Sequence, residues 1–221
     1  MNPALRASAA HVFVDALDAI SLSRDDSHHL FRVLRLRDGE PVTVSDGRGG
    51  WQVCTVAGNA LLPTGDVLVE PAATQLTIAA AIPKGDRVEW MVQKLTELGT
   101  SEVVFMHCER SVVRWKGERG AHQLERLARV AREAAMQSRR VWLPQLRGPV
   151  EFAEAAAFAG AVIADPEGDV AGTPSVVLIG PEGGFTETER QACPRIRLAP
   201  GILRVETAAV AAAAILGRDG R

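Results

Sequence analysis

The chain has 221 residues, of which 47% are hydrophobic and 24% are charged, and its formal net charge is −2. This composition is typical of an ordinary globular protein with one or two domains. The apolar runs are too short to span a bilayer, and the first residues lack the apolar core of a secretory signal. Three scattered cysteines, Cys54, Cys108 and Cys193, indicate neither a disulfide framework nor a zinc site. We therefore expect a cytoplasmic protein without a membrane segment or a metal.

The charge is unevenly distributed along the chain. Residues 1–72 contain 6 Arg and 9 acidic residues, a net of −3, whereas residues 109–147 contain 10 Lys or Arg and 4 acidic residues, a net of +6. A local basic stretch can bind phosphate even in an acidic protein. On charge alone, a solvated helix face with i,i+4 ion pairs is the simpler interpretation.

The first part of the chain is rich in strand patterns. Short alternating or apolar runs at 11–14, 41–56 and 66–70 are separated by turn signals such as Asp46-Gly47. Residues 21–36 have helical spacing. The pattern predicts a small β-barrel or sandwich with one short helix, which we assign to residues 1–72.

After residue 73, strands alternate with helices. The patterns predict strands at 77–82, 102–107, 161–165, 175–180 and 196–198. They predict helices at 86–98, 121–137 and 206–217; the first has Leu98 on its apolar face and Gly99 as its C-cap. This alternation favours an α/β domain with a mostly parallel sheet over residues 73–221.

A glycine-rich loop follows the predicted strand that ends near Ile179, in the sequence IGPEGGFTETE. Thr186 and Glu189 form a capping-box pattern, so the loop joins a buried strand to a helix, where open α/β sheets bind ligands. The glycine spacing fits neither the Rossmann nor the P-loop pattern, and Glu182 would repel a triphosphate. The expected ligand is therefore neutral or cationic near Glu182.

A second strand–loop–helix segment, LAPGILRVETAAV, covers Leu198–Val210. Arg204 and Glu206 stand at the start of the final helix. Each alone would more simply be a surface ion-pair residue or a helix cap. Two such segments, each after a strand near the C-terminus, favour a binding site.

These segments carry a family resemblance. KGDRVEWMVQKLTELG (84–99), CERS (108–111), EAAMQSR (133–139), IGPEGG (179–184) and LAPGILRVETA (198–208) occur in the order found in SPOUT methyltransferases. The chain most resembles the branch that methylates N3 of a uridine in 16S ribosomal RNA of the small subunit. The resemblance covers the whole chain.

The resemblance implies a SPOUT fold with a C-terminal trefoil knot, preceded by a PUA-like β-barrel that docks RNA, in a homodimer. It also implies S-adenosylmethionine as the cofactor. The implied cofactor-binding residues are Ile179, Gly180, Glu182, Gly183, Gly184, Leu198, Pro200, Ile202, Leu203 and Thr207. The uracil base must be unpaired, because N3 lies on its Watson–Crick edge. The candidate catalytic residues are Arg204, which would stabilise charge on a uracil oxygen, and Glu206, which would orient Arg204 or take the proton.

Candidate RNA-binding residues follow from the same resemblance and from the basic stretch. They are Arg32, Arg35, Arg37, Lys84, Lys94, Arg110, Gln137 and Arg139. The three arginines of RVLRLRDG could equally be solvated residues at a barrel edge. Two alternatives stay open: a SPOUT enzyme for another RNA or for a ribose 2′-hydroxyl, and a ribosome-assembly factor that binds RNA without catalysis. A nicotinamide-dependent dehydrogenase does not fit the glycine loop.

Overall fold

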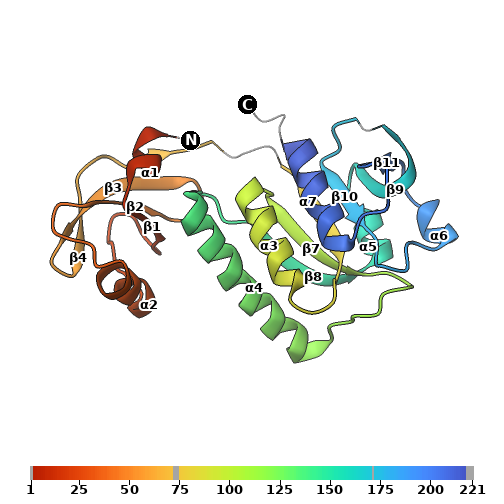
Figure 1. Ribbon diagram of the computed structural model, residues 1–221, viewed down its shortest axis with the longest axis horizontal. Coiled ribbons are helices and arrows are strands. Elements are labelled where there is room, and N and C mark those ends of the chain that lie inside the picture. Colours follow the sequence, from red (N-terminus) through yellow and green to blue (C-terminus); the bar gives the residue numbers. More distant parts are fainter. Residues whose placement is uncertain (1, 72–74, 171, 218–221) are drawn as a thin grey trace. The chain divides into compact units, whose positions relative to one another are not determined.

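The structure is a computed structural model, which describes residues 2–71, 75–170 and 172–217. The chain forms two compact units (Figure 1). The first contains Met1–Ala72 and Arg132–Leu143, and the second contains Ala73–Ala131 and Pro144–Arg221. The sequence analysis placed 132–143 in the second domain, whereas the structure groups these residues with the first unit.

The first unit is built on a five-stranded sheet. Its strands follow the order β1-β2-β3-β4, with β5 also paired to β3; β1 and β2 are parallel and the other pairs are antiparallel. The strand bounds are β1 Ala10–Phe13, β2 Pro41–Ser45, β3 Gly50–Ala57, β4 Ala60–Pro63 and β5 Leu68–Val69. Helix α1 is Pro3–Ala7, and the helix expected over 21–36 is shorter, with α2 at Arg24–His28 and a π-helical segment at His29–Val33.

The segment 132–143 is part of this unit because its side chains and backbone satisfy buried polar groups there. The Arg132 guanidinium donates hydrogen bonds to both carboxylate oxygens of Asp26, at 3.0 and 2.8 Å. The carbonyl of Arg140 accepts a hydrogen bond from Nε2 of the buried His11 at 3.0 Å. Burial alone would raise the pKa of Asp26, but the hydrogen bonds from Arg132 and Ser23 outweigh burial and lower it.

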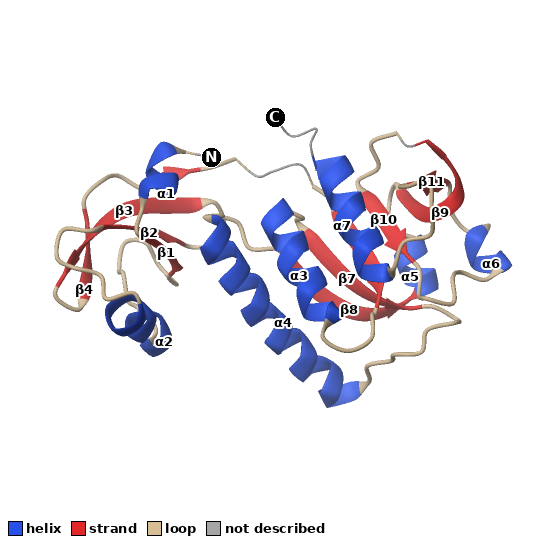
Figure 2. Cartoon of the chain, in the orientation of Figure 1, coloured by secondary structure: helices blue, strands red, loops and turns tan. Residues whose placement is uncertain are grey.

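The second unit is a six-stranded sheet in the order β11-β9-β10-β6-β7-β8, in which each neighbouring pair is parallel (Figure 2). The strands are β6 Thr77–Ala81, β7 Glu102–His107, β8 Gln145–Glu151, β9 Ala161–Val170, β10 Val176–Ile179 and β11 Arg195–Arg197. The helices are α3 Arg87–Leu98, α4 Gly117–Ser138, α5 Phe152–Ala156, α6 Glu187–Arg190 and α7 Val205–Leu216; the last part of α4 lies in the first unit.

Both faces of this sheet are covered, which explains why its central strands β6, β7 and β10 are largely apolar. Ile78 and Ala80 of β6 pack in a cluster with α3 and α7, whereas Ala79 and Ala81 pack in a cluster with α5. Helices α3 and α7 lie against each other over one face (Figure 2). The predicted apolar face of α3 is buried except for Leu98, which is exposed because it is the last residue before the Gly99 cap.

Candidate cofactor site

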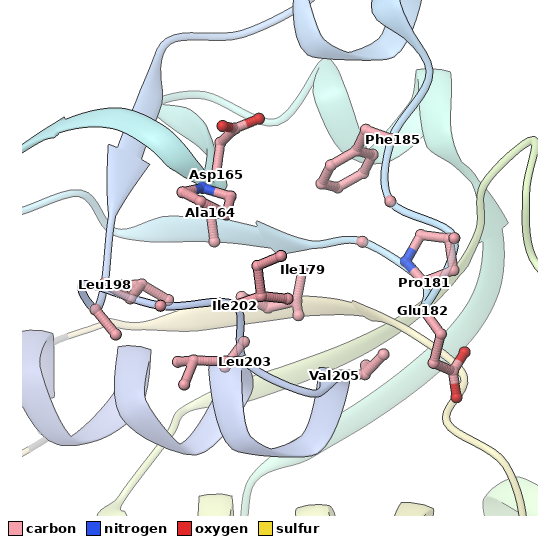
Figure 3. A pocket seen from close by; sticks show the side chains of 17 residues that line it. Ala164, Asp165, Ile179, Pro181, Glu182, Phe185, Leu198, Ile202, Leu203 and Val205 are labelled. Carbon is pink, nitrogen blue, oxygen red and sulfur yellow. The ribbon is translucent and has the colours of Figure 1, made fainter.

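A cavity of about 350 Å³ lies beside the middle of β9, at the end of β10 and the start of α7 (Figure 3). Three segments form its wall: the middle of β9, the glycine loop after β10, and the loop between β11 and α7. The lining residues are Ala164, Asp165, Pro166, Ile179, Gly180, Pro181, Glu182, Gly183, Gly184, Phe185, Leu198, Ala199, Gly201, Ile202, Leu203, Val205 and Ala208. The cavity thus occupies the carboxyl edge of the parallel sheet, where open α/β folds bind ligands.

Most of the predicted cofactor-binding residues line this cavity. The structure brings together Ile179, Gly180, Glu182, Gly183, Gly184, Leu198, Ile202 and Leu203, but not Pro200 or Thr207, which are exposed. The sequence analysis missed Asp165 and Phe185. Asp165 could have been found, because it ends the strand predicted at 161–165, next to the glycine-loop strand. Phe185 gave no separate signal.

The local sequence explains the shape of the glycine loop. A Cβ on Gly180 would lie 2.8 Å from the ring of Phe185, so only glycine lets this buried ring fold under the loop. Gly184 has a φ of +70°, which favours glycine. The predicted capping box is confirmed: Thr186 caps α6 by accepting from the Glu189 N–H, and Glu189 accepts from the Thr186 N–H.

The charged residues that line the cavity are acidic. Among the described residues, the charged side chains in its lining are those of Asp165 and Glu182. Asp165 is buried, and its carboxylate is held by Arg190, whose Nε lies 2.9 Å away. Glu182 is exposed at the rim. A mostly apolar cavity with acidic groups suits a neutral or cationic ligand better than a phosphate.

S-adenosylmethionine fits this site by size and chemistry. The cavity volume lies in the range of roughly 300–1,000 Å³ that is usual for small-molecule sites. The cofactor carries a sulfonium and an ammonium group and has no phosphate. Glu182 can face its positive charge, the loop backbone can bond its polar edges, and Leu198, Ile202 and Leu203 can pack on its flat adenine ring.

Arg204 and Glu206 lie beside the cavity rather than in its wall. Arg204 is the N-cap residue of α7 and is exposed between the lining residues Leu203 and Val205. Glu206 is buried, and Oε1 lies 3.7 Å from Nε of Arg87 at the start of α3. Its other carboxylate oxygen is buried without a hydrogen-bond partner among the described residues. The ion pair of Glu206 is thus with Arg87, which the sequence analysis did not single out.

The predicted RNA-binding residues fall into two groups. Arg32, Arg35, Arg37 and Gln137 in the first unit and Lys84 in the second are exposed. The other three are engaged within the protein. Lys94 pairs with Glu97 at 2.8 Å, Arg139 donates to the carbonyls of Met136, Ser8 and Ala9, and Arg110 donates to those of Gly183 and Phe185.

Within residues 2–71, 75–170 and 172–217, no three His, Cys, Asp or Glu side chains are grouped so that they could hold a metal ion. In the same ranges, no helix combines the length and the apolar character needed to cross a membrane.

A parallel α/β sheet with a mostly apolar cavity at its carboxyl edge, suited to a ligand without phosphate, is typical of small-ligand-binding enzymes. Comparison with known proteins gives the family. The chain matches the model of the RNA methyltransferase domain over residues 70–217 and that of the RNA methyltransferase PUA domain over residues 22–59. The chain therefore belongs to the RNA methyltransferase domain family.

Its relatives carry a more specific name. The chain is 31% identical to "Ribosomal RNA small subunit methyltransferase E" of Mycobacterium bovis, over 87% of this chain and 84% of that protein. It is 27% identical to the protein of the same name from Bacillus subtilis, over 88% of each chain.

Solved structures of methyltransferases are also similar to this chain. The Neisseria gonorrhoeae protein of that name, bound to S-adenosyl methionine, aligns with a TM-score of 0.79 and 26% identity, covering 94% of this chain and 96% of that one. A Legionella pneumophila methyltransferase with bound cofactor SAM aligns with a TM-score of 0.79 and 27% identity, covering 93% and 96%.

Proposed function

We propose that this chain uses S-adenosylmethionine to methylate N3 of one uridine in 16S ribosomal RNA of the small subunit. The observation that carries the proposal is the cavity between the glycine loop and the Leu198–Ala208 segment, whose lining is mostly apolar and, among the described residues, has Asp165 and Glu182 as its charged side chains. The names of the relatives from Mycobacterium bovis and Bacillus subtilis support the choice of RNA. The choice of N3 rests on the resemblance of the five sequence segments.

The bound cofactor would supply an electrophilic methyl group, which passes from sulfur to N3. The residues of the chain hold the two reactants in line and exclude other geometries. The uridine must be splayed out of any duplex, because N3 is otherwise covered by base pairing. Arg204 is exposed beside the cavity, between the lining residues Leu203 and Val205, and we place the flipped base next to it.

Arg204 would then stabilise the transition state. When the N3 proton leaves, negative charge spreads onto the neighbouring uracil carbonyl oxygens, and a guanidinium can bond an oxygen there. The proton passes to solvent, which reaches this side because Arg204 is exposed. Glu206 is buried outside the cavity wall and paired with Arg87, so we assign it a positioning role at the start of α7.

The remaining parts of the proposal concern the whole protein. The first unit docks RNA through Arg32, Arg35, Arg37 and Gln137, and Lys84 of the second unit contributes a phosphate contact. The C-terminal segments that surround the cavity form a trefoil knot, and two chains act as a homodimer in the cytoplasm. Light scattering coupled to gel filtration measures the dimer directly, and a purely monomeric protein would contradict this part.

The reaction itself is tested with small ribosomal subunits that lack the modification. The purified protein is incubated with them and S-adenosylmethionine, and the digested RNA is analysed by mass spectrometry of its nucleosides. The proposal expects new N3-methyluridine at one site, and none with Arg204→Ala. Methylation of a ribose 2′-hydroxyl or of another base would redirect the proposal to a different atom, and RNA binding without methylation would favour an assembly factor.

A further inference from the structure

The loop after β7, Cys108-Glu109-Arg110-Ser111, lies against the glycine loop after β10. Nη1 of Arg110 donates hydrogen bonds to the carbonyl of Gly183 at 3.1 Å and to that of Phe185 at 3.4 Å. Both acceptors belong to the loop that lines the cavity. Hydrogen bonds from a charged donor are stronger than neutral ones, so these bonds hold the loop backbone in one place.

The stem of Arg110 also touches this loop. A Cβ on Gly183 would lie 3.3 Å from Cβ of Arg110, which is tighter than an ordinary contact. Gly183 is not among the glycines with positive φ. We attribute the glycine at this position to the close approach of Arg110, rather than to an unusual backbone conformation.

A second tie joins the same two loops. Glu189 is buried, and Oε1 accepts a hydrogen bond from the backbone N–H of Glu109 at 2.9 Å. Its other oxygen accepts from the N–H of Thr186 at 2.8 Å. The glycine loop is thus attached to the loop after β7 through Arg110 at its middle and through Glu189 at its end.

We propose that Arg110 is a positioning residue that holds the glycine loop in its cofactor-binding shape before RNA arrives. A loop with two adjacent glycines loses much conformational entropy when it is fixed. If only a fraction of molecules has the competent loop, the apparent Kd for the cofactor rises in inverse proportion to that fraction. The identity of the cofactor rests on the proposed function; the contacts of Arg110 do not.

The test is equilibrium binding of S-adenosylmethionine to the full chain without RNA. We expect Arg110→Ala to raise the Kd about tenfold, a modest factor because Arg110 is exposed and solvent can replace part of the two lost hydrogen bonds. Arg119→Ala is the matched control, because Arg119 is an exposed arginine of the same basic stretch, and it should leave the Kd unchanged. An unchanged cofactor Kd in Arg110→Ala, together with weakened RNA binding, would show that Arg110 is an RNA contact and overturn the proposal.

A double-mutant cycle separates loop positioning from a general loss of structure. Gly183→Ala should weaken cofactor binding, because the new Cβ pushes the loop away from Arg110 and lengthens its hydrogen bonds. In the Arg110→Ala background those bonds are already lost, so the second substitution should add little. Fully additive effects of the two substitutions would contradict a shared mechanism.

Hydrogen exchange gives a readout that needs no ligand. The N–H of Gly184 bonds the carbonyl of Pro181 at 2.8 Å, so its protection reports whether the loop is closed. Arg110→Ala should speed hydrogen exchange at the amides of Gly184 and Thr186, while the exchange rates of the β10 amides stay unchanged. Unchanged exchange in this loop would refute the proposal, and failure of the wild-type chain to bind S-adenosylmethionine would instead refute the proposed function.

Discussion

His11 illustrates how one buried side chain ties separate parts of the chain together. It lies on β1, and its Nε2–H donates to the carbonyl of Arg140 while Nδ1 lies 2.9 Å from the hydroxyl of Thr43. A carbonyl only accepts, so the ring is the Nε2–H tautomer with Nδ1 as an acceptor. Burial, together with the charge of Arg139, holds the pKa of His11 at about 4, below its ordinary value of 6.5.

We predict that His11 makes the stability of the first unit depend on pH. Between pH 6.5 and 4 the unfolded chain binds a proton that the folded chain does not, so stability falls as the pH is lowered through this window. The loss approaches ~3 kcal/mol near pH 4. An NMR titration, with the His11 signal identified by its absence in His11→Gln, should give a midpoint near 4; a midpoint at the ordinary value of 6.5 would contradict the burial argument.

Arg204 and Glu206 should respond differently to substitution. Arg204→Ala removes the group proposed to stabilise uracil oxygen charge, so we expect kcat to fall about 10²–10³-fold with little change in cofactor Kd. Glu206→Gln removes only an ion pair with the half-exposed Arg87, so its effect on kcat should stay below about tenfold.

Single-turnover rates measured across pH distinguish these roles. If Glu206 were the proton acceptor, Glu206→Gln would lower the rate about 10²–10⁴-fold and remove the acidic limb of its pH profile. A positioning role leaves the shape of the profile unchanged. Arg87→Ala breaks the same pair and should likewise leave the shape of the profile unchanged.

At the scale of elements, the C-terminal cap of helix α3 contributes to the stability of the protein. Gly99 adopts φ 84° and ψ 26°, and its N–H bonds the carbonyls of Leu95 and Thr96. Only glycine adopts this left-handed conformation without strain. We predict that Gly99→Ala lowers the free energy of unfolding by about 1 kcal/mol, measured by urea denaturation.

The matched control for this prediction is Gly65→Ala. Gly65 lies in the loop after β4, its φ is not positive, and a Cβ there would meet nothing within 4 Å. That substitution should be neutral or slightly stabilising, because it reduces the entropy of the unfolded chain. Equal destabilisation by both changes would argue against the left-handed cap as the cause.

Elements with a regular apolar period were predictable from sequence, whereas the edge strand β8 was not. The strands at the centre of the sheet, β6, β7 and β10, are buried on both faces and read as apolar runs. Strand β8 is an edge strand whose sequence, QLRGPVE, contains a Gly-Pro pair that resembles a turn. An edge strand tolerates proline because one side of its backbone is unpaired. β9 is an internal strand, and it continues through Pro166 where its pairing with β11 shifts register, between Ile163 and Asp169.

The site was predictable where its residues are consecutive in sequence. The two loops were found from their glycines and their position after strands. Arg87 and Arg110 contact residues far away in the chain, and no local pattern reveals such partners. The sequence placed Arg110 among the RNA contacts because its charge was visible and the carbonyls of Gly183 and Phe185 were not.

At the scale of the whole molecule, the chain leaves the first unit after residue 72 and returns to it at residues 132–143. The returning segment supplies the Gly47–Leu143 and Gly49–Val141 backbone hydrogen bonds, at 3.0 and 3.1 Å, and places Val141 in a buried cluster with Leu5 and Trp51. The first unit is therefore complete only when the end of α4 and the residues up to 143 are present.

We predict that residues 1–72 alone do not reach the stability of this unit. Without 132–143, Asp26 loses its Arg132 partner and His11 loses the carbonyl of Arg140, so two buried polar groups each lose a hydrogen-bond partner. Joining 132–143 to 1–72 through a Gly/Ser linker should restore cooperative unfolding in urea and the low pKa of His11. The same linker followed by the segment in reversed order is the matched control and should restore neither, because it presents the same composition without Arg132, Arg140 and Val141 in place. Equal unfolding midpoints for 1–72 alone and for the joined chain would show that the returning segment does not contribute to the stability of the first unit.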